Sequence, residues 1–184
     1  MIIALVVLVV VGILVMSMYN KLVSLKNRVL EAWSGIDVQL KKRYDLIPNL
    51  VNTVKGYAAH ESGTLEKVIQ ARNQAMAAGS GGSINDQVQA ENALSGTLKS
   101  LFALSESYPD LKANTSFLAL QSSLAEIEET LQNARRYYNA LVRDNNTAVE
   151  SFPSNLIANN FNFEKFDFFE IENDAERSNP VVQF

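Results

Sequence analysis

The chain contains 184 residues, of which 47% are hydrophobic, and its formal net charge is −4 at pH 7. This length suits one domain plus a membrane segment, and the acidic balance gives no overall cationic field for nucleic acid. The lack of cysteine excludes disulfides, thiolate nucleophiles and cysteine-ligated metal sites. His60 is the single histidine, so we expect a surface or boundary residue there and no histidine-based metal site or catalytic triad.

The first 18 residues form an uncharged apolar run in which Ser17 is the one mildly polar side chain. At about 1.5 Å per residue, a helix of this length spans about 27 Å, close to the ~30 Å hydrocarbon core of a bilayer. A cleaved signal peptide would need a basic residue before the run and a small-x-small cleavage site, and a buried core helix would be apolar on one side only. The sequence fits neither alternative, so we predict a retained transmembrane helix over residues 1–19.

Basic residues directly after this run predict the orientation of the chain. Lys21, Lys26 and Arg28 follow the apolar segment, and no lysine or arginine precedes it. Positive flanking residues favour the cytoplasmic side. We therefore expect a single-pass membrane protein with its soluble domain in the cytoplasm, although the opposite insertion stays open.

Helical periodicity begins immediately after the membrane segment. Apolar residues recur at spacings of three and four, which places them on one stripe of a helix. The members of this stripe are Leu22, Leu25, Val29, Ala32, Ile36, Leu40, Tyr44 and Ile47. The membrane helix is therefore expected to run directly into the first helix of the domain. At Pro48 two outcomes stay open: a second helix begins there, or the first helix continues with a kink.

Three further periodic stretches follow. The second runs through Val51 to Ala75 and ends in a flexible connection at residues 79–83, and the third runs from about Ile84 to Tyr108. The fourth is a heptad seam, typical of a coiled coil, with cap candidates at residues 114–116. Its members are Phe117, Leu120, Leu124, Ile127, Leu131, Ala134, Tyr138 and Leu141.

The composition changes from Ser151 onward. Seven of the nine phenylalanines lie in this tail, together with Pro153 and Pro180. We expect residues 151–184 to be mostly irregular, with the rings clamped onto the helices. The alternative is a segment that uses its rings to bind a partner or the membrane interface.

Candidate sites of chemistry are few. Two carboxylate pairs, Glu128 with Glu129 and Glu170 with Glu172, give no sign of converging in a pocket. The glycine-rich connection lacks the following Lys-Ser/Thr of a phosphate-binding loop. The basic run at residues 41–43 is read as a solvated helix face. We therefore expect no catalytic, cofactor-binding or metal-binding residues, and no enzyme.

Polar residues near the predicted core call for partners, because a buried polar group without a hydrogen bond is costly. We expect these residues to tie the fourth stretch to the junction near Pro48 and to fix the packing register. They are Arg43, Asp45, Asn49, Arg135 and Asn139.

The segments YNKLVSLKNRVLEAWSGIDVQLKKRYDLIPNLVNTVKGYAAHE (19–61), YPDLKANTSFLAL (108–120), NARRYYNALV (133–142) and FPSNLIA (152–158), followed by Phe168-Phe169, together resemble the LemA family. Gly35 stands where a polar residue is expected in that pattern, and it could loosen the first helix. The resemblance implies a bacterial protein with an N-terminal membrane helix and a cytoplasmic bundle of long antiparallel helices. It also implies an association with envelope quality control or stress, without a defined molecular activity.

These observations predict an all-α fold: a transmembrane helix (1–19), an antiparallel bundle of about four long helices (20–150) and an irregular tail packed on it (151–184). The expected function is a membrane-anchored helical scaffold, homo-oligomeric through an apolar surface of its long helices, in the cell envelope. The alternative is an adaptor that presents the bundle or the tail to a membrane protease or a signalling partner. The expected partners are the lipid bilayer, further copies of the chain and an envelope protein; no cofactor is expected.

Overall fold

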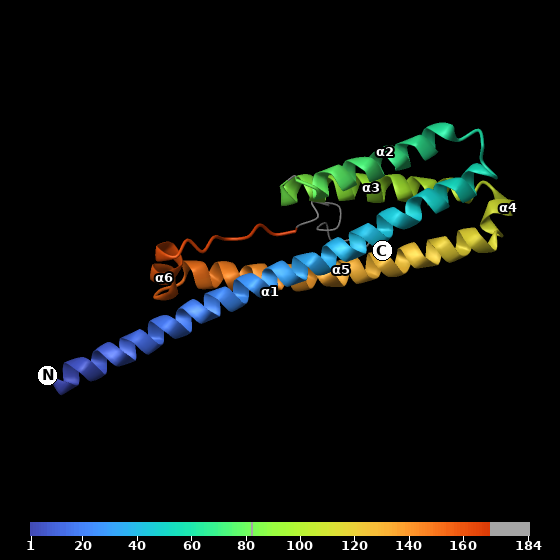
Figure 1. Cartoon of the computed structure of the whole chain (residues 1–184). Coiled ribbons are helices and arrows are strands. Elements are labelled where there is room, and N and C mark those ends of the chain that lie inside the picture. Colours follow the sequence, from blue (N-terminus) through green and yellow to red (C-terminus); the bar gives the residue numbers. More distant parts are fainter. Residues whose placement is uncertain (82, 170–184) are drawn as a thin grey trace, which may run out of the picture. The chain divides into compact units, whose positions relative to one another are not determined.

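The computed structural model describes residues 1–81 and 83–169, and every regular element in these two ranges is a helix (Figure 1). The prediction of an all-helical fold is confirmed. Four helices are long, as the periodic stretches predicted, and two are short. In chain order they are α1 (Ile2–Lys55), α2 (Ser62–Gly79), α3 (Ile84–Ser105), α4 (Pro109–Lys112), α5 (Thr115–Glu150) and α6 (Ser154–Asn160).

The described chain divides into two compact units. The first unit contains residues 1–46 and 120–168, and the second contains residues 47–119 together with Phe169. Both α1 and α5 contribute residues to each unit, so each unit combines an early and a late part of the sequence.

Helix α1 is continuous from the predicted membrane segment to Lys55, with Pro48 inside it. Of the two outcomes left open at Pro48, no second helix begins there, and the first helix continues. A proline removes one donor from the helical ladder, and the helix tolerates this loss here. The break comes later, where the carbonyl of Val54 accepts hydrogen bonds from the amides of Tyr57 and Ala58. The second periodic stretch is thus divided by a turn at residues 56–61, and His60 lies exposed in this turn.

In the first unit, α1 and α5 run antiparallel with a constant register. The rings of Trp33 and Tyr138 are in contact at an angle of 57°, with centroids 5.3 Å apart. Ten residues further along α1, Arg43 faces Glu128, which lies ten residues back along α5. The predicted stripe of α1 supplies the buried face, with Leu22, Val29 and Ile36 almost completely covered. The heptad seam of α5 supplies the opposite face, where Leu124, Leu131 and Tyr138 are buried.

In the second unit, α2 packs against α3, joined by the predicted connection at residues 79–83. A capping box starts α3, because the Ser83 hydroxyl accepts from the Asp86 amide and the Asp86 carboxylate accepts from the Ser83 amide. The short helix α4 was not predicted. The Asn114 side chain caps α5 by accepting from the Phe117 amide at 2.9 Å, as the cap candidates suggested.

The tail is more ordered than the sequence suggested, as far as the structure describes it. The short helix α6 is followed by a turn at residues 161–162 and by a segment without regular secondary structure over residues 163–168, which we call the strap. Ala158 and Phe169 are buried. Phe152 and Phe161 are exposed. Phe184, Glu170 and Glu172 lie outside the described residues.

Candidate functional site at the end of the apolar segment

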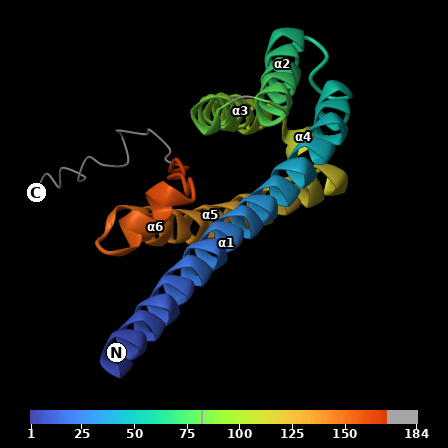
Figure 2. The same cartoon turned by 60° about the vertical axis from the view of Figure 1, so that its left-hand side comes forward.

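The N-terminal part of α1 has no packing partner within the first unit and extends past α5 and α6 (Figures 1 and 2). Residues 2–16 carry exposed isoleucine, leucine, valine and methionine side chains on all sides. The helix is long and apolar enough to cross a membrane. A helix that is apolar all round, with no protein around it, is suited to a lipid environment.

A small core closes the first unit just after this apolar segment. Leu22 of α1, Val149 of α5 and Ala158 of α6 pack together, with Phe163 of the strap against them. Tyr19 lies at the same end, where its ring makes edge contacts with Phe161 and Phe163 at centroid distances of 4.9 and 5.7 Å. Aromatic contacts of this kind add to the area that is buried. The tail is therefore attached to α1 where the apolar segment ends.

Side chains of α5 hold the strap through its backbone. Asn146 donates to the Phe166 carbonyl and accepts from the Phe166 amide, both at 2.9 Å. The Tyr138 hydroxyl donates to the Asp167 carbonyl at 3.0 Å. Burial, with a smaller effect of the Asp167 carboxylate, raises the pKa of Tyr138 to about 12. The strap is therefore held in one register along α5.

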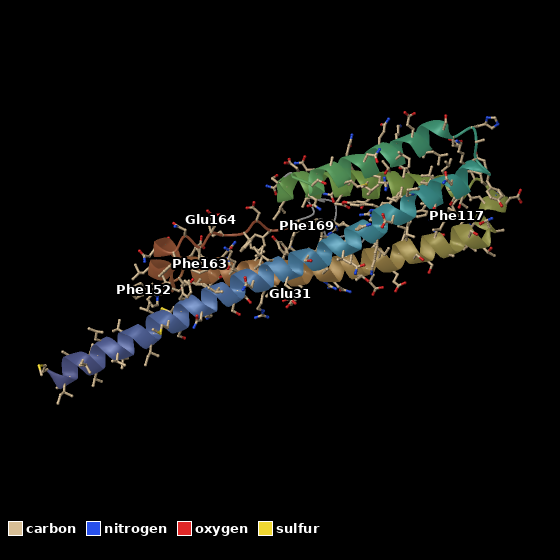
Figure 3. All side chains as sticks on the ribbon, in the orientation of Figure 1. Glu31, Phe117, Phe152, Phe163, Glu164 and Phe169 are labelled. Atoms are coloured by element: carbon tan, nitrogen blue, oxygen red, sulfur yellow. The ribbon has the colours of Figure 1, made fainter. Side chains whose placement is uncertain are left out.

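Apolar side chains around α6 point away from the protein. Phe152, Leu156 and Phe161 are all more than half exposed, and Phe152 reaches 79%. Figure 3 shows Phe152 and Phe163 near the same end of the unit, with Phe163 among the helices. The rings of Phe161 and Phe163 contact Tyr19, which follows the apolar run. The same end of the unit thus carries both the apolar helix and an exposed apolar cluster.

A groove of about 710 Å³ opens beside this cluster, within the first unit. Its walls come from one face of α1, from the last turns of α5 and from the start of α6. Charged, polar and apolar side chains all line it. They are Met18, Lys21, Leu22, Leu25, Arg28, Arg143, Asp144, Thr147, Ala148, Ser151, Pro153 and Ser154.

The polar residues that the sequence singled out are partly brought together. Arg43 is buried, and its guanidinium lies 3.5 Å from the Glu128 carboxylate, so this residue does link α1 to α5. Arg135 is also buried. Asp45, in contrast, is exposed and pairs with Lys41 on its own helix at 2.8 Å. Arg43 therefore does not belong to the solvated face that was expected for residues 41–43.

Of the two carboxylate pairs, the structure describes Glu128 with Glu129, and these two side chains do not share a pocket. Glu128 faces Arg43, and Glu129 is exposed on the surface of α5. Within residues 1–81 and 83–169, no three histidine, aspartate or glutamate side chains gather so as to hold a metal ion.

Sequence reasoning missed the two asparagines that hold the strap. Asn145 is buried and donates to the Glu164 carbonyl, and Asn146 makes the paired bonds with Phe166. Asn145 lies four residues after Leu141, on the continuation of the heptad seam. An asparagine at a seam position signals a buried amide that needs a partner. That signal was present in the sequence.

Several known proteins are similar in sequence to most of this chain. The MamQ 2 magnetosome protein of Paramagnetospirillum magneticum is 23% identical over an alignment that covers 83% of this chain and 64% of that protein. The MamQ magnetosome protein of Magnetospirillum gryphiswaldense is 22% identical, over 82% of this chain and 64% of that protein. The LemA protein of Metamycoplasma hominis is 25% identical, over 83% of this chain and 66% of that protein. The chain thus spans less than two thirds of the MamQ proteins.

The family model described as the LemA family matches residues 32–184. This range begins after the apolar segment and includes α2 to α6 and most of α1 beyond the apolar run. Together with the apolar part of α1, these findings support a helical, single-pass membrane protein. The match covers most of the chain, and the chain belongs to the LemA family.

Proposed function

We propose that this protein is a membrane-anchored scaffold that assembles with further copies of itself in the organisation of the bacterial cell envelope or in its response to stress. One helix leads from the membrane into the first unit without a break. A continuous helix transmits its position rigidly, which suits a structural support. Such a scaffold needs a surface through which copies of the chain associate.

A row of apolar residues on α1 supplies this surface, and it is the observation that carries the proposal. Leu30 and Val38 are 48% and 51% exposed, and the half-buried Val23 precedes them in the row. Successive members are seven and eight residues apart, about two helical turns, so they share one side of α1. This side differs from the face packed on α5, and burying it against a second copy removes apolar area from water.

The oligomeric state of the full chain in a mild detergent tests the scaffold. We expect light scattering to show a defined oligomer for the unaltered chain and monomers for the Leu30→Glu, Val38→Glu double variant. Exposed Ser122 and Ser123 lie on α5, outside this row. The Ser122→Glu, Ser123→Glu variant adds the same charge, so it is the control and keeps the oligomer. A monodisperse monomer for the unaltered chain rejects the scaffold.

The side of the membrane that carries the domain is part of the proposal. The positive residues after the apolar segment favour the cytoplasm. Because the chain has no cysteine, Ser80→Cys in the exposed connection gives a single site for labelling. We expect a membrane-impermeant maleimide to label it only after cell lysis. Labelling after the outer envelope alone is permeabilised would place the domain on the periplasmic side.

The exposed apolar cluster around α6 favours a second candidate, an adaptor for a membrane protease or another envelope protein. Phe152 and Leu156 are exposed and available for a partner. Removing the whole tail would not test this idea cleanly, because Ala158 and Phe169 are buried and their loss would disturb the fold. A photo-crosslinking amino acid at Leu156 tests it in cells, with the exposed Lys42 position as control. Crosslinks to a protease at Leu156 alone support the adaptor, and crosslinks to lipid or to another copy of the chain count against it.

A further inference from the structure

The groove at the end of the apolar segment carries an unusual concentration of positive charge. Lys21 and Arg28 of α1 and Arg143 of α5 line it, against one carboxylate, Asp144. The chain as a whole is acidic, with a net charge of −4. The volume of the groove, about 710 Å³, lies within the range of small-molecule sites. A cationic groove in an acidic protein suits an anionic ligand.

The pairing register of the two helices places like charges together. Trp33 meets Tyr138, so five residues back along α1 and five residues further along α5 bring Arg28 level with Arg143. Elsewhere in the first unit Lys41, Arg43 and Lys165 each have a carboxylate partner. Within residues 1–81 and 83–169, no ion pair joins Lys21, Arg28 or Arg143 to a carboxylate. An anion between the two arginines would relieve their repulsion and gain charge-assisted hydrogen bonds.

The position of the groove along α1 identifies the source of the anion. Met18, at the end of the apolar run, lines the groove, and Lys21 lies only about 4.5 Å further along the helix axis. The headgroup layer of each leaflet is roughly 5–7 Å thick. Side chains of a helix lean toward its N-terminus, which here is the end that enters the membrane. Lys21 therefore lies at the level of the headgroup layer, and Arg28, about 15 Å beyond Met18 along the helix axis, leans toward that layer from outside it.

We propose that this groove binds the phosphate-bearing headgroup of an anionic phospholipid from the leaflet next to which α1 leaves the bilayer. Lys21 contacts the phosphate at the headgroup level, and the long side chains of Arg28 and Arg143 reach toward it from the outer end of the groove. The exposed Phe152 and Leu156 next to the groove offer an apolar surface to the acyl chains. A soluble anion would find the same charges but would gain nothing from the apolar surroundings.

Native mass spectrometry of the full chain released from detergent tests the proposal. Phosphatidylglycerol and phosphatidylcholine are supplied at equal concentration, and inorganic phosphate is supplied in a separate arm. We expect phosphatidylglycerol to bind in preference, and the Arg28→Gln, Arg143→Gln variant to lose at least about tenfold in that preference. Equal binding of the two lipids, or phosphate that competes fully with phosphatidylglycerol, overturns the proposal.

Two further variants separate the groove from the general effect of charge. Lys42 of α1 and Arg136 of α5 are exposed and lie outside the groove, so Lys42→Gln with Arg136→Gln removes the same charge and keeps the preference. Arg28→Lys with Arg143→Lys keeps the charge and retains most of the preference. An equal loss in the Lys42 and Arg136 variant would mean that net charge, and not the groove, selects the lipid. The oligomer test uses other residues, so either proposal can fail while the other stands.

Discussion

Ile13 and Ile36 are the same residue type on the same helix, yet Ile13 is 60% exposed and Ile36 is completely buried. The neighbours of Ile13 are apolar on all sides, whereas Ile36 lies between Gly35 and Asp37 on a helix with one apolar stripe. One continuous helix therefore uses two environments: lipid for its first part and α5 for its middle part. The distribution of apolar residues around a helix, more than their number, indicates what surrounds the helix.

Truncation of the two isoleucines should give the largest difference. We expect Ile36→Ala to lower the free energy of unfolding by about 2–5 kcal/mol, because it leaves a cavity in a packed core. We expect Ile13→Ala to leave that free energy unchanged, because the Ile13 side chain is 60% exposed and leaves no cavity when it is shortened. Trp33 is the only tryptophan and contacts Tyr138, so its fluorescence during denaturant titration in detergent reports on the first unit. Similar losses for the two variants would contradict the comparison.

Substitution of Tyr138, which carries a polar group on the buried face of α5, should lower the free energy of unfolding by a smaller amount that depends on pH. Tyr138→Phe keeps the ring against Trp33 but removes the hydrogen bond to the Asp167 carbonyl, at a cost of about 1 kcal/mol. The pKa of Tyr138 is raised from 10.0 to about 12, so the folded state holds this proton more tightly than the unfolded state. That contribution is complete below pH 10 and is lost as the pH rises to about 12.

Thermal melts from pH 7 to pH 12 check this prediction. The gap between the unaltered chain and Tyr138→Phe should be largest at neutral pH and shrink between about pH 10 and pH 12. Tyr137 is exposed, so Tyr137→Phe serves as the control and should show no such trend. A gap that stays constant across this range would mean that Tyr138 titrates alike in the folded and unfolded states.

The smallest effect concerns two glycines, one in each environment. A methyl group at Gly35 or at Gly12 would meet no atom within 4 Å. Alanine costs less backbone entropy than glycine when a helix forms, so Gly35→Ala should raise the free energy of unfolding by about 0.5–1 kcal/mol. Gly12→Ala should leave it unchanged, because Gly12 lies in the apolar segment. Denaturant titration followed by Trp33 fluorescence measures both, and a loss of stability in Gly35→Ala would show that the exposed face of α1 is covered in solution.

Much of the fold could be predicted from local patterns. The connection at residues 79–83 and the cap at Asn114 appear where the residue types indicated. The fate of Pro48 could not be predicted, because local sequence favours a helix start there and only the surrounding contacts decide whether the helix continues. The strap was missed for a similar reason, since its hydrogen bonds join residues about twenty positions apart.

The pattern of apolar residues alone sets the kind of environment that each part of the chain enters. Side chains that are apolar all round suit lipid, and a stripe at helical spacing suits a protein core, whatever partner the stripe meets. Only the tertiary structure decided the register of α1 on α5, and with it the groove that brings Lys21, Arg28 and Arg143 together. Periodicity specifies a face but not its partner residue, because register depends on contacts between segments that lie far apart in the chain, as Arg43 and Glu128 or Trp33 and Tyr138 do.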